Sequence, residues 1–172
     1  MIITTTLVIF LIIVFVLVWL FVNTIDKRKW LTFIISLVLT PFIYFYAFYP
    51  MVNIFSNYHH LKYFDTESWI DTPELRYEMS DDLIASKQLI GKTKEEVIEI
   101  LGENDWLSWN DALKGKDDNV WNYGLGIEPG AFNENKDILL VTFKNNKVVS
   151  VDTYEMPILE AQKEEKAADA KE

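Results

Sequence analysis

Residues 2–52 read IITTTLVIFLIIVFVLVWLFV-NTIDKRK-WLTFIISLVLTPFIYFYAFYPMV, with hyphens added around the seven residues that separate two uncharged runs. The runs are residues 2–22 and 30–52. At about 1.5 Å of rise per residue, the shorter run makes a helix of about 31 Å, close to the thickness of a bilayer's hydrocarbon core. We therefore expect two transmembrane helices that form a tight antiparallel hairpin.

Charged residues are distributed unevenly along the chain. The sequence has 16 basic and 26 acidic residues, and within the first 52 positions only four neighbours are charged: Asp26, Lys27, Arg28 and Lys29. Residues 53–172 are therefore strongly acidic, which argues against nucleic acid as a partner. Because the chain has no Cys, a disulfide-stabilised scaffold is also excluded. The composition predicts a membrane segment, with the lipid bilayer as a partner, followed by a water-soluble part.

The membrane segment raises the questions of cleavage and orientation. A cleaved signal peptide is the alternative for residues 2–22, but no Lys or Arg precedes this run and no A-x-A-like site follows it. Three basic residues lie in the loop between the runs, and only Lys62 lies within about 15 residues after the second run. We therefore expect a cytoplasmic loop, with the N-terminus and the C-terminal domain on the outer side of the membrane. An inverted hairpin with a cytoplasmic domain is the alternative.

A connector and a helix are expected directly after the membrane segment. Residues 53–71 contain many aromatic residues without a clear period, which is typical of a juxtamembrane connector. Thr72 and Pro73 predict a helix start, because Thr is a good N-cap and Pro fits the first helical position. The apolar residues that follow recur every four positions and predict a helix over residues 73–88.

A second, shorter helix has a clearer start. Thr93 and Glu96 have the S/T-x-x-E spacing of a capping box, and Gly102 is placed to end the helix. We expect this helix at residues 94–101. Because so short a helix is unstable alone, it must pack against the rest of the domain.

The pattern then changes to that of an antiparallel sheet. Three strands are expected at residues 119–125, 137–143 and 147–154, with Asn145-Asn146 as a two-residue turn between the last two. Five strand residues are expected to point inward: Leu139, Val141, Phe143, Val149 and Val151. Trp106 and Trp109 are expected to begin or flank a further short strand.

The predicted fold class is α+β. A transmembrane hairpin in residues 1–52 is followed by an ααβββ domain in residues 72–156, in which two helices pack on a three-stranded antiparallel sheet. Residues 157–172 are rich in Glu, Lys and Ala, with almost no large apolar residue. They are expected to form a disordered charged tail, at most transiently helical, with no core to join.

Three motifs follow one another in the domain. Residues 91–102 have the pattern G-x-T-x-x-x-V-x-x-x-L-G, residues 121–123 have W-x-Y, and residues 138–151 form a closing hairpin. In this order they resemble the SmpA/OmlA (BamE-like) domain, over about residues 75–154. The resemblance implies a fold related to that of β-lactamase inhibitory proteins, and a small domain that binds proteins or maintains the cell envelope. Members that assemble outer-membrane proteins are lipoproteins with an N-terminal Cys, whereas this chain has no Cys and two membrane helices.

Several groups that suggest chemistry have simpler interpretations. Gly91-Lys92-Thr93 ends like a Walker A motif, but Ser86 stands where that motif requires Gly, so the capping box is favoured. His59 and His60, with Asp65 and Glu67 nearby, could supply zinc ligands, but no third ligand stands at a recognisable spacing. We therefore predict neither a nucleotide nor a metal site.

Acidic and hydroxyl residues do not form a catalytic set either. Asp81-Asp82 and the group Glu95, Glu96 and Glu99 fall on charged helix faces, where no carboxyl is shielded for acid–base work. Ser80 and Ser86 have no nearby His to act as a base. No catalytic residue and no cofactor are predicted.

Four aromatic residues are the predicted partner-binding set: Trp106, Trp109, Trp121 and Tyr123. Aromatic side chains on a free sheet face are frequent hot spots for a protein partner, although packing in the core is the alternative for each one. Residues 124–136 form a long polar connection beside them and are a candidate mobile loop.

The leading hypothesis is a non-enzymatic, membrane-anchored protein that binds a partner in the cell envelope or maintains the envelope, with an extracytoplasmic BamE-like domain on the outer face of a bacterial cytoplasmic (inner) membrane. The alternative is a structural subunit of a larger membrane complex, in which the transmembrane hairpin makes the specific contacts. A hydrolase that acts on envelope material is a third hypothesis.

Overall fold

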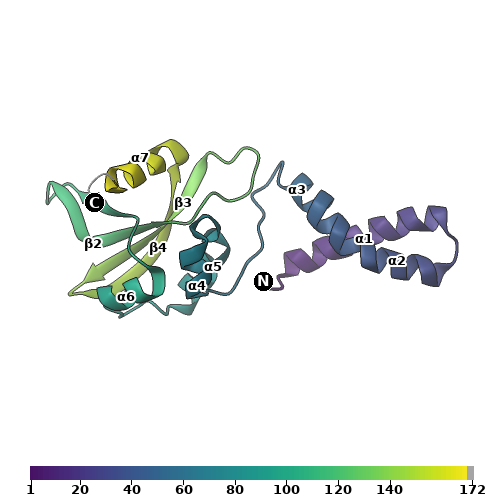
Figure 1. Ribbon diagram of the computed structural model, residues 1–172, viewed down its shortest axis with the longest axis horizontal. Helices are drawn as coiled ribbons and strands as arrows, with labels where there is room; N and C mark the ends of the chain where they lie inside the picture. Colours follow the sequence, from purple (N-terminus) through teal and green to yellow (C-terminus); the bar gives the residue numbers. More distant parts are fainter. Residues whose placement is uncertain (170–172) are drawn as a thin grey trace. The chain divides into compact units, whose positions relative to one another are not determined.

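The computed structural model describes residues 1–169 of the chain. These residues form two compact units. The first comprises residues 1–60 and 129–132, and the second comprises residues 61–128 and those from 133 onward. Figure 1 shows the helical hairpin of the first unit and the sheet with its helices in the second.

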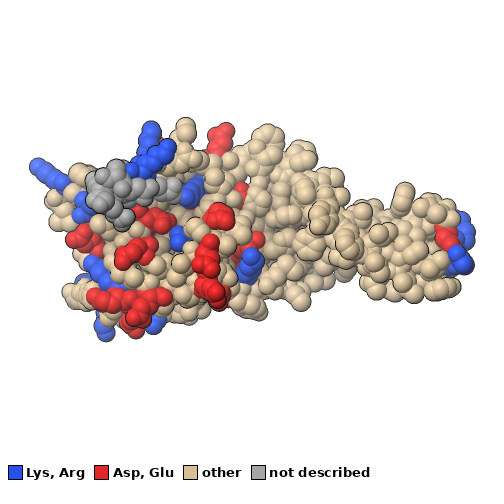
Figure 2. Space-filling model, in the orientation of Figure 1, with Lys and Arg blue, Asp and Glu red and all other residues tan. Residues whose placement is uncertain are grey.

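The first unit contains two long apolar helices. Helix α1 is Thr5–Ile25, and the second long helix, Lys29–Val52, consists of α2 (Lys29–Ile43), a π-helical segment (Tyr44–Phe48) and α3 (Tyr49–Val52). Both are long and apolar enough to cross a membrane, judged by length and composition. In Figure 2 the visible surface of these helices is uncharged apart from the loop that joins them.

The two helices pack through a stripe of small polar residues on α2. Thr32, Ser36 and Thr40 are buried there, and the buried residues of α1 are aliphatic: Leu7, Val14, Val18 and Val22. Ser36 Oγ donates to Thr32 O and Thr40 Oγ1 donates to Ser36 O, both at 2.7 Å. Because these hydroxyls are satisfied within their own helix, the helices can approach closely without leaving a polar group unpaired.

The loop between the helices is closed by an ion pair. Arg28 Nη2 lies 2.7 Å from Asp26 Oδ2, and the Arg28 backbone N–H also donates to this carboxylate. These hydrogen bonds lower the pKa of Asp26 to about 2. The carboxylate therefore stays ionised and paired with Arg28.

The second helix changes its winding before Pro50. Pro50 has no N–H to donate, and its ring would press on the carbonyl four residues earlier in a regular α-helix. Residues Tyr44–Phe48 wind as a π-helix instead, and the Tyr49 N–H donates to Tyr44 O, five residues back. Tyr44 is fully buried, and its hydroxyl lies 3.0 Å from His60 Nε2.

The second unit is built on a four-stranded antiparallel sheet in the order β1-β2-β3-β4. The strands are β1 (Trp106–Asn110), β2 (Gly115–Gly124), β3 (Asn135–Lys144) and β4 (Lys147–Pro157). The α+β class is confirmed, but the predicted count of three strands is wrong. Residues 106–110 form the additional strand because the turn before Gly115 folds them back onto β2.

Helices α4 (Thr66–Asp71), α5 (Tyr77–Ser86) and α6 (Lys94–Leu101) contribute to a core with one face of the sheet. The bounds predicted for α6 are confirmed, and so is its capping box: Thr93 N–H donates to Glu96 Oε2 at 2.8 Å, and Glu96 N–H donates to Thr93 Oγ1 at 3.4 Å. The helix predicted over residues 73–88 is shorter, because it begins as a 3-10 turn (Pro73–Leu75) and α5 ends where Lys87 turns left-handed at φ 53°.

The predicted connector at residues 53–71 is partly a helix. Its last six residues form α4, which begins at an N-cap: Asp65 Oδ2 accepts from Ser68 N–H at 2.8 Å. Trp69 in this helix is fully buried in the core. Sequence periodicity did not reveal α4, because this six-residue helix buries a single side chain.

The prediction of a disordered tail is wrong for residues 158–169. They form α7 (Ile158–Asp169), which packs against β1, β3 and β4 on the sheet face opposite the other helices (Figure 1). Ala161 is fully buried, and Lys116 Nζ lies 2.6 Å from Glu164 Oε2. The remaining residues of the predicted tail, 170–172, lie outside the described residues.

One inward assignment in β4 is wrong. Leu139, Val141 and Phe143 are buried as predicted, but Val149 is half exposed and Val148 is buried instead. The register shifts at this point, since Thr142 pairs with Ser150 whereas Phe143 pairs with Val148. This β-bulge places an extra residue in β4, so the alternation of inward and outward side chains slips by one.

Candidate functional site

Three of the four predicted partner-binding aromatic residues belong to the interior. Trp106, Trp121 and Tyr123 are buried, and the Trp121 ring centroid lies 4.6 Å from that of Phe143. Tyr123 OH donates to Gly102 O at 3.1 Å, and burial raises the pKa of this phenol. For these three residues the alternative of packing in the core therefore holds, and Figure 1 shows helices on both faces of the sheet.

Trp109 is the exposed member of the set. Its side chain is 61% exposed on β1, and its Nε1 donates to Asp111 Oδ1 at 3.0 Å. Leu113 is also exposed, in the turn after β1. The predicted aromatic cluster is therefore reduced to one tryptophan at the end of the β1–β2 hairpin.

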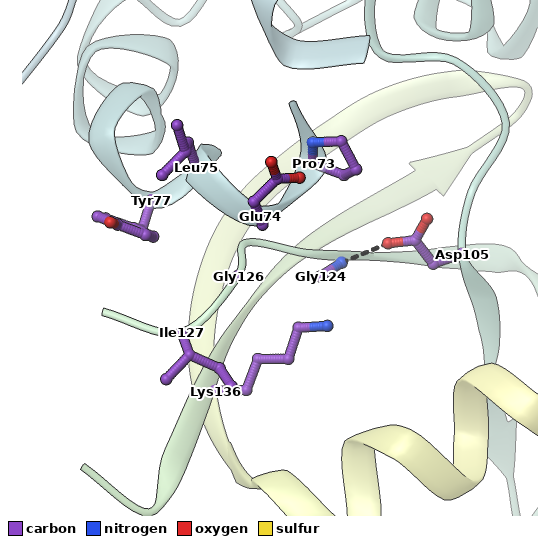
Figure 3. A pocket seen from close by; sticks show the side chains of 9 residues that line it. All are labelled: Pro73, Glu74, Leu75, Tyr77, Asp105, Gly124, Gly126, Ile127 and Lys136. Atoms are coloured by element: carbon purple, nitrogen blue, oxygen red, sulfur yellow. Dashed lines mark hydrogen bonds between the residues drawn. The ribbon is translucent and has the colours of Figure 1, made fainter. Parts of the chain in front are cut away.

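A hollow of about 680 Å³ lies elsewhere in the second unit (Figure 3). One side is formed by the 3-10 turn, through Pro73, Glu74 and Leu75, together with Tyr77 at the start of α5. The end of β2 and the residues after it supply Gly124, Gly126 and Ile127. Asp105 and Lys136 complete the lining from two further segments.

Apolar side chains form walls of this hollow, and charged side chains also line it. Pro73, Leu75, Tyr77 and Ile127 supply apolar surface, and in the view of Figure 3 the charged side chains Glu74 and Lys136 lie on opposite sides of the chain segment that carries Gly124 and Ile127. A pocket with apolar walls and a few charged groups suits a partner's side chain or a small ligand.

Arg76 fixes the segments that line the hollow. This residue is buried, its Nε donates to Trp69 O at 2.9 Å, and its guanidinium carbon lies 5.1 Å from the centroid of the Trp69 ring. Its Nη1 lies 3.2 Å from Asp105 Oδ2 and 3.3 Å from Gly124 O. Burial lowers the pKa of Arg76, while the charge of Asp105 acts in the opposite direction.

Asp105 joins the same network from the other side. Its Oδ2 accepts from Gly124 N–H at 2.6 Å, the bond drawn in Figure 3. Arg76 and Asp105 together therefore hold the end of β2 through both its N–H and its C=O. Sequence reasoning missed this pair, because the two residues are far apart in the chain and neither stands in a motif.

Gly126 allows the chain to pass the turn closely. A Cβ at this position would lie 2.1 Å from Glu74 O, and the glycine has φ +90°. Tyr77 N–H donates to Leu125 O at 2.8 Å beside this crossing. The hollow is thus bounded by two backbone segments in close contact, and only a glycine without a Cβ permits this approach.

A smaller groove of about 370 Å³ lies between the end of α5 and β4. Ile84, Leu89, Ile90, Val149 and Val151 give it apolar walls, and Lys87 lies at its edge. It has fewer polar groups than the hollow at Arg76, so we consider the hollow the stronger binding site.

Two of the residues weighed for chemistry serve structural roles. Thr93 takes part in the capping box, and Asp82 Oδ2 accepts from Phe64 N–H at 2.8 Å. Among residues 1–169, no three His, Asp or Glu side chains are grouped so that they could hold a metal ion. The hollow itself is lined by no His, Ser or Thr that could serve as a base or nucleophile.

Comparisons with protein-family models, with characterised proteins and with solved structures find no significant match to this chain. The resemblance to the SmpA/OmlA domain accordingly rests on the motifs alone.

Proposed function

We propose that this chain is a membrane-anchored, non-enzymatic binding protein whose α+β domain takes a side chain of a protein partner into the hollow beside Arg76. The observation that carries the proposal is the hollow of about 680 Å³, with its apolar walls and flanking charges. Binding hot spots favour such pockets, because a partner's side chain loses its contact with water there.

The chemistry of the lining favours a particular kind of partner residue. Leu75, Tyr77 and Ile127 would contact an apolar or aromatic body, while Glu74 and Lys136 would pair with polar groups around it. Because Arg76 and Asp105 already hold the lining segments, little ordering is needed on binding. This preorganisation favours a binding site over a simple packing defect as the interpretation of the hollow.

The membrane helices and the charge of their loop support an envelope location. By the positive-inside rule, the loop with Lys27, Arg28 and Lys29 would be cytoplasmic and the domain would lie outside the cytoplasmic membrane. The motif resemblance to the SmpA/OmlA domain also favours an envelope partner.

A matched pair of crosslinking positions tests the proposed site. Ile127 lines the hollow and Ile70 lies in α4, and their side chains are 46% and 45% exposed. With a photo-crosslinking amino acid at each position in the full chain, intact cells should give a discrete adduct from position 127 that position 70 does not give. Adducts of equal yield at both positions, or none at 127, would contradict the proposal.

The alternative, in which the hairpin makes the specific contacts, has less support. The small polar residues that suit helix packing, Thr32, Ser36 and Thr40, are already buried in the hairpin. Replacing the hairpin by an unrelated pair of membrane helices distinguishes the hypothesis that the domain makes the specific contacts from the hypothesis that the hairpin does. If the adduct at position 127 persists, the domain carries the function.

A further inference from the structure

The loop at residues 129–132 belongs to the hairpin's compact unit, although the rest of that unit ends at His60. Ala131 N–H donates to Asn53 O at 3.0 Å, and Asn53 is the C-cap of α3. The base of the loop is closed by Asn133, whose Nδ2 donates to Glu128 O at 3.1 Å. The loop is therefore a short closed turn that touches the end of the second apolar helix.

Large apolar side chains at this place are exposed. Phe132 is 79% exposed and Phe55 is 85% exposed, and Ile54 beside Phe55 is also exposed. The two segments themselves carry no charge, since residues 129–132 are Pro-Gly-Ala-Phe and residues 53–60 contain no Asp, Glu, Lys or Arg, while Glu128 and Glu134 lie on either side of the loop. Water is a poor environment for such side chains, whereas the boundary between headgroups and acyl chains accepts them.

The length of the second helix sets the depth of this place in a bilayer. The 24 residues of Lys29–Val52 span about 36 Å, which exceeds a hydrocarbon core of about 30 Å. Asn53 would then lie in the interfacial region. Phe55 and Phe132 would lie at the same level, because Ala131 is hydrogen-bonded to Asn53.

We propose that Phe132 and Phe55, with Ile54, form an aromatic patch that inserts into the lipid interface, so that the domain's own loop binds the membrane surface. The partner is the bilayer itself, since the patch continues the apolar surface of the hairpin and carries no charge. The proposal rests on the proposed membrane anchoring, and it adds a lipid contact from the domain part of the chain.

The absence of Cys from the sequence allows a direct test in the full chain. Single-cysteine variants Phe132→Cys and Phe55→Cys would be labelled with an environment-sensitive fluorophore and reconstituted into phosphatidylcholine vesicles, with or without bromine on the acyl chains. Val16→Cys in α1 reports on the hairpin itself, and Leu113→Cys provides an exposed apolar position in the second unit.

We expect bromolipid to quench the labels at positions 16, 55 and 132, several-fold more strongly than at position 113. Quenching at 16 without quenching at 132 would overturn this inference and leave the membrane anchor intact. No quenching at 16 would overturn the anchor and, with it, the inference. Quenching at 113 as strong as at 132 would also overturn it, because lipid contact would then be a general property of the exposed apolar residues.

Discussion

Arg76 Nη1 lies 3.2 Å from Asp105 Oδ2, and this carboxylate oxygen also accepts the Gly124 N–H, so an ion pair with a buried guanidinium joins the start of α5 to the end of β2. The guanidinium adds bonds to Trp69 O and Gly124 O. Removing the Arg76 side chain leaves the Asp105 carboxylate without this cation and two carbonyls without a donor, which costs more than the ion pair itself contributes.

Arg76→Met is therefore expected to lower the free energy of unfolding by about 3 kcal/mol. Tryptophan fluorescence of the full chain in detergent, followed through a denaturant titration, measures this. Lys92→Met is the control, because Lys92 pairs with Glu96 at 3.4 Å and neither of these side chains is buried. That pair should contribute less than about 1 kcal/mol. Equal losses in the two variants would contradict the assigned role of Arg76.

Two glycines with similar φ angles allow the steric cost of an added Cβ to be distinguished from the cost of its left-handed backbone conformation. Gly126→Ala places a Cβ 2.1 Å from Glu74 O at φ +90°, whereas Gly91→Ala meets nothing within 4 Å at φ +83°. The Gly91 variant should lose about 1–2 kcal/mol for its left-handed angle alone. Gly126→Ala should lose clearly more, because backbone must also move, and the difference in midpoint denaturant concentration measures that excess. Similar midpoints would show that the two segments do not cross so closely.

Adjacent valines test the bulge in β4. Val148 is buried and Val149 is half exposed, so Val148→Ala should cost about 1–2 kcal/mol and Val149→Ala less than about 0.5 kcal/mol. The two substitutions are chemically identical, which makes each the control for the other. If Val149→Ala lost more stability than Val148→Ala in thermal unfolding, the result would contradict the bulge and indicate an unshifted register.

Local signals were sufficient to predict some of these features. The capping box of α6 depends on Thr93 and Glu96, three residues apart, and the turn at Asn145-Asn146 depends on two residues that tolerate positive φ. The apolar runs of the hairpin depend on composition alone. In each case the determining interactions lie within a few neighbouring residues.

Features that depend on distant residues were not predicted. The bond between Arg76 and Asp105 joins residues 29 apart, and the bulge at Val149 depends on pairing with β3. Helix α7 was missed because its burial depends on Ala161, a small side chain that a hydropathy pattern does not reveal. The hollow was missed because four separate segments line it. For the same reason a sequence pattern marked Trp121 and Tyr123 as surface candidates, although α-helices cover them.

The capping box also predicts how stability depends on pH. The Thr93 N–H bonded to the Glu96 carboxylate lowers the pKa of Glu96 from its ordinary value of 4.5. A carboxyl with a lowered pKa in the folded state stabilises the protein above its unfolded pKa, and this contribution is lost as the pH falls through the folded value. Glu96→Gln should therefore flatten the loss of stability below pH 4.5, relative to the parent chain. Glu99→Gln on the same helix is the control, and an equal effect of both substitutions would argue against the box as its origin.

Membrane orientation is the remaining prediction, and the Cys-free chain makes it accessible. Ile25→Cys in the loop region and Leu113→Cys in the domain are both exposed, and neither substitution changes a charge. If the three basic loop residues keep the loop cytoplasmic, a membrane-impermeant maleimide added to intact cells, with access to the outer face of the cytoplasmic membrane, should label position 113 and spare position 25. Permeabilised cells, in which both positions should react, control for accessibility. Labelling of position 25 alone would place the domain in the cytoplasm, and the partner of the hollow beside Arg76 would then have to be sought among cytoplasmic proteins.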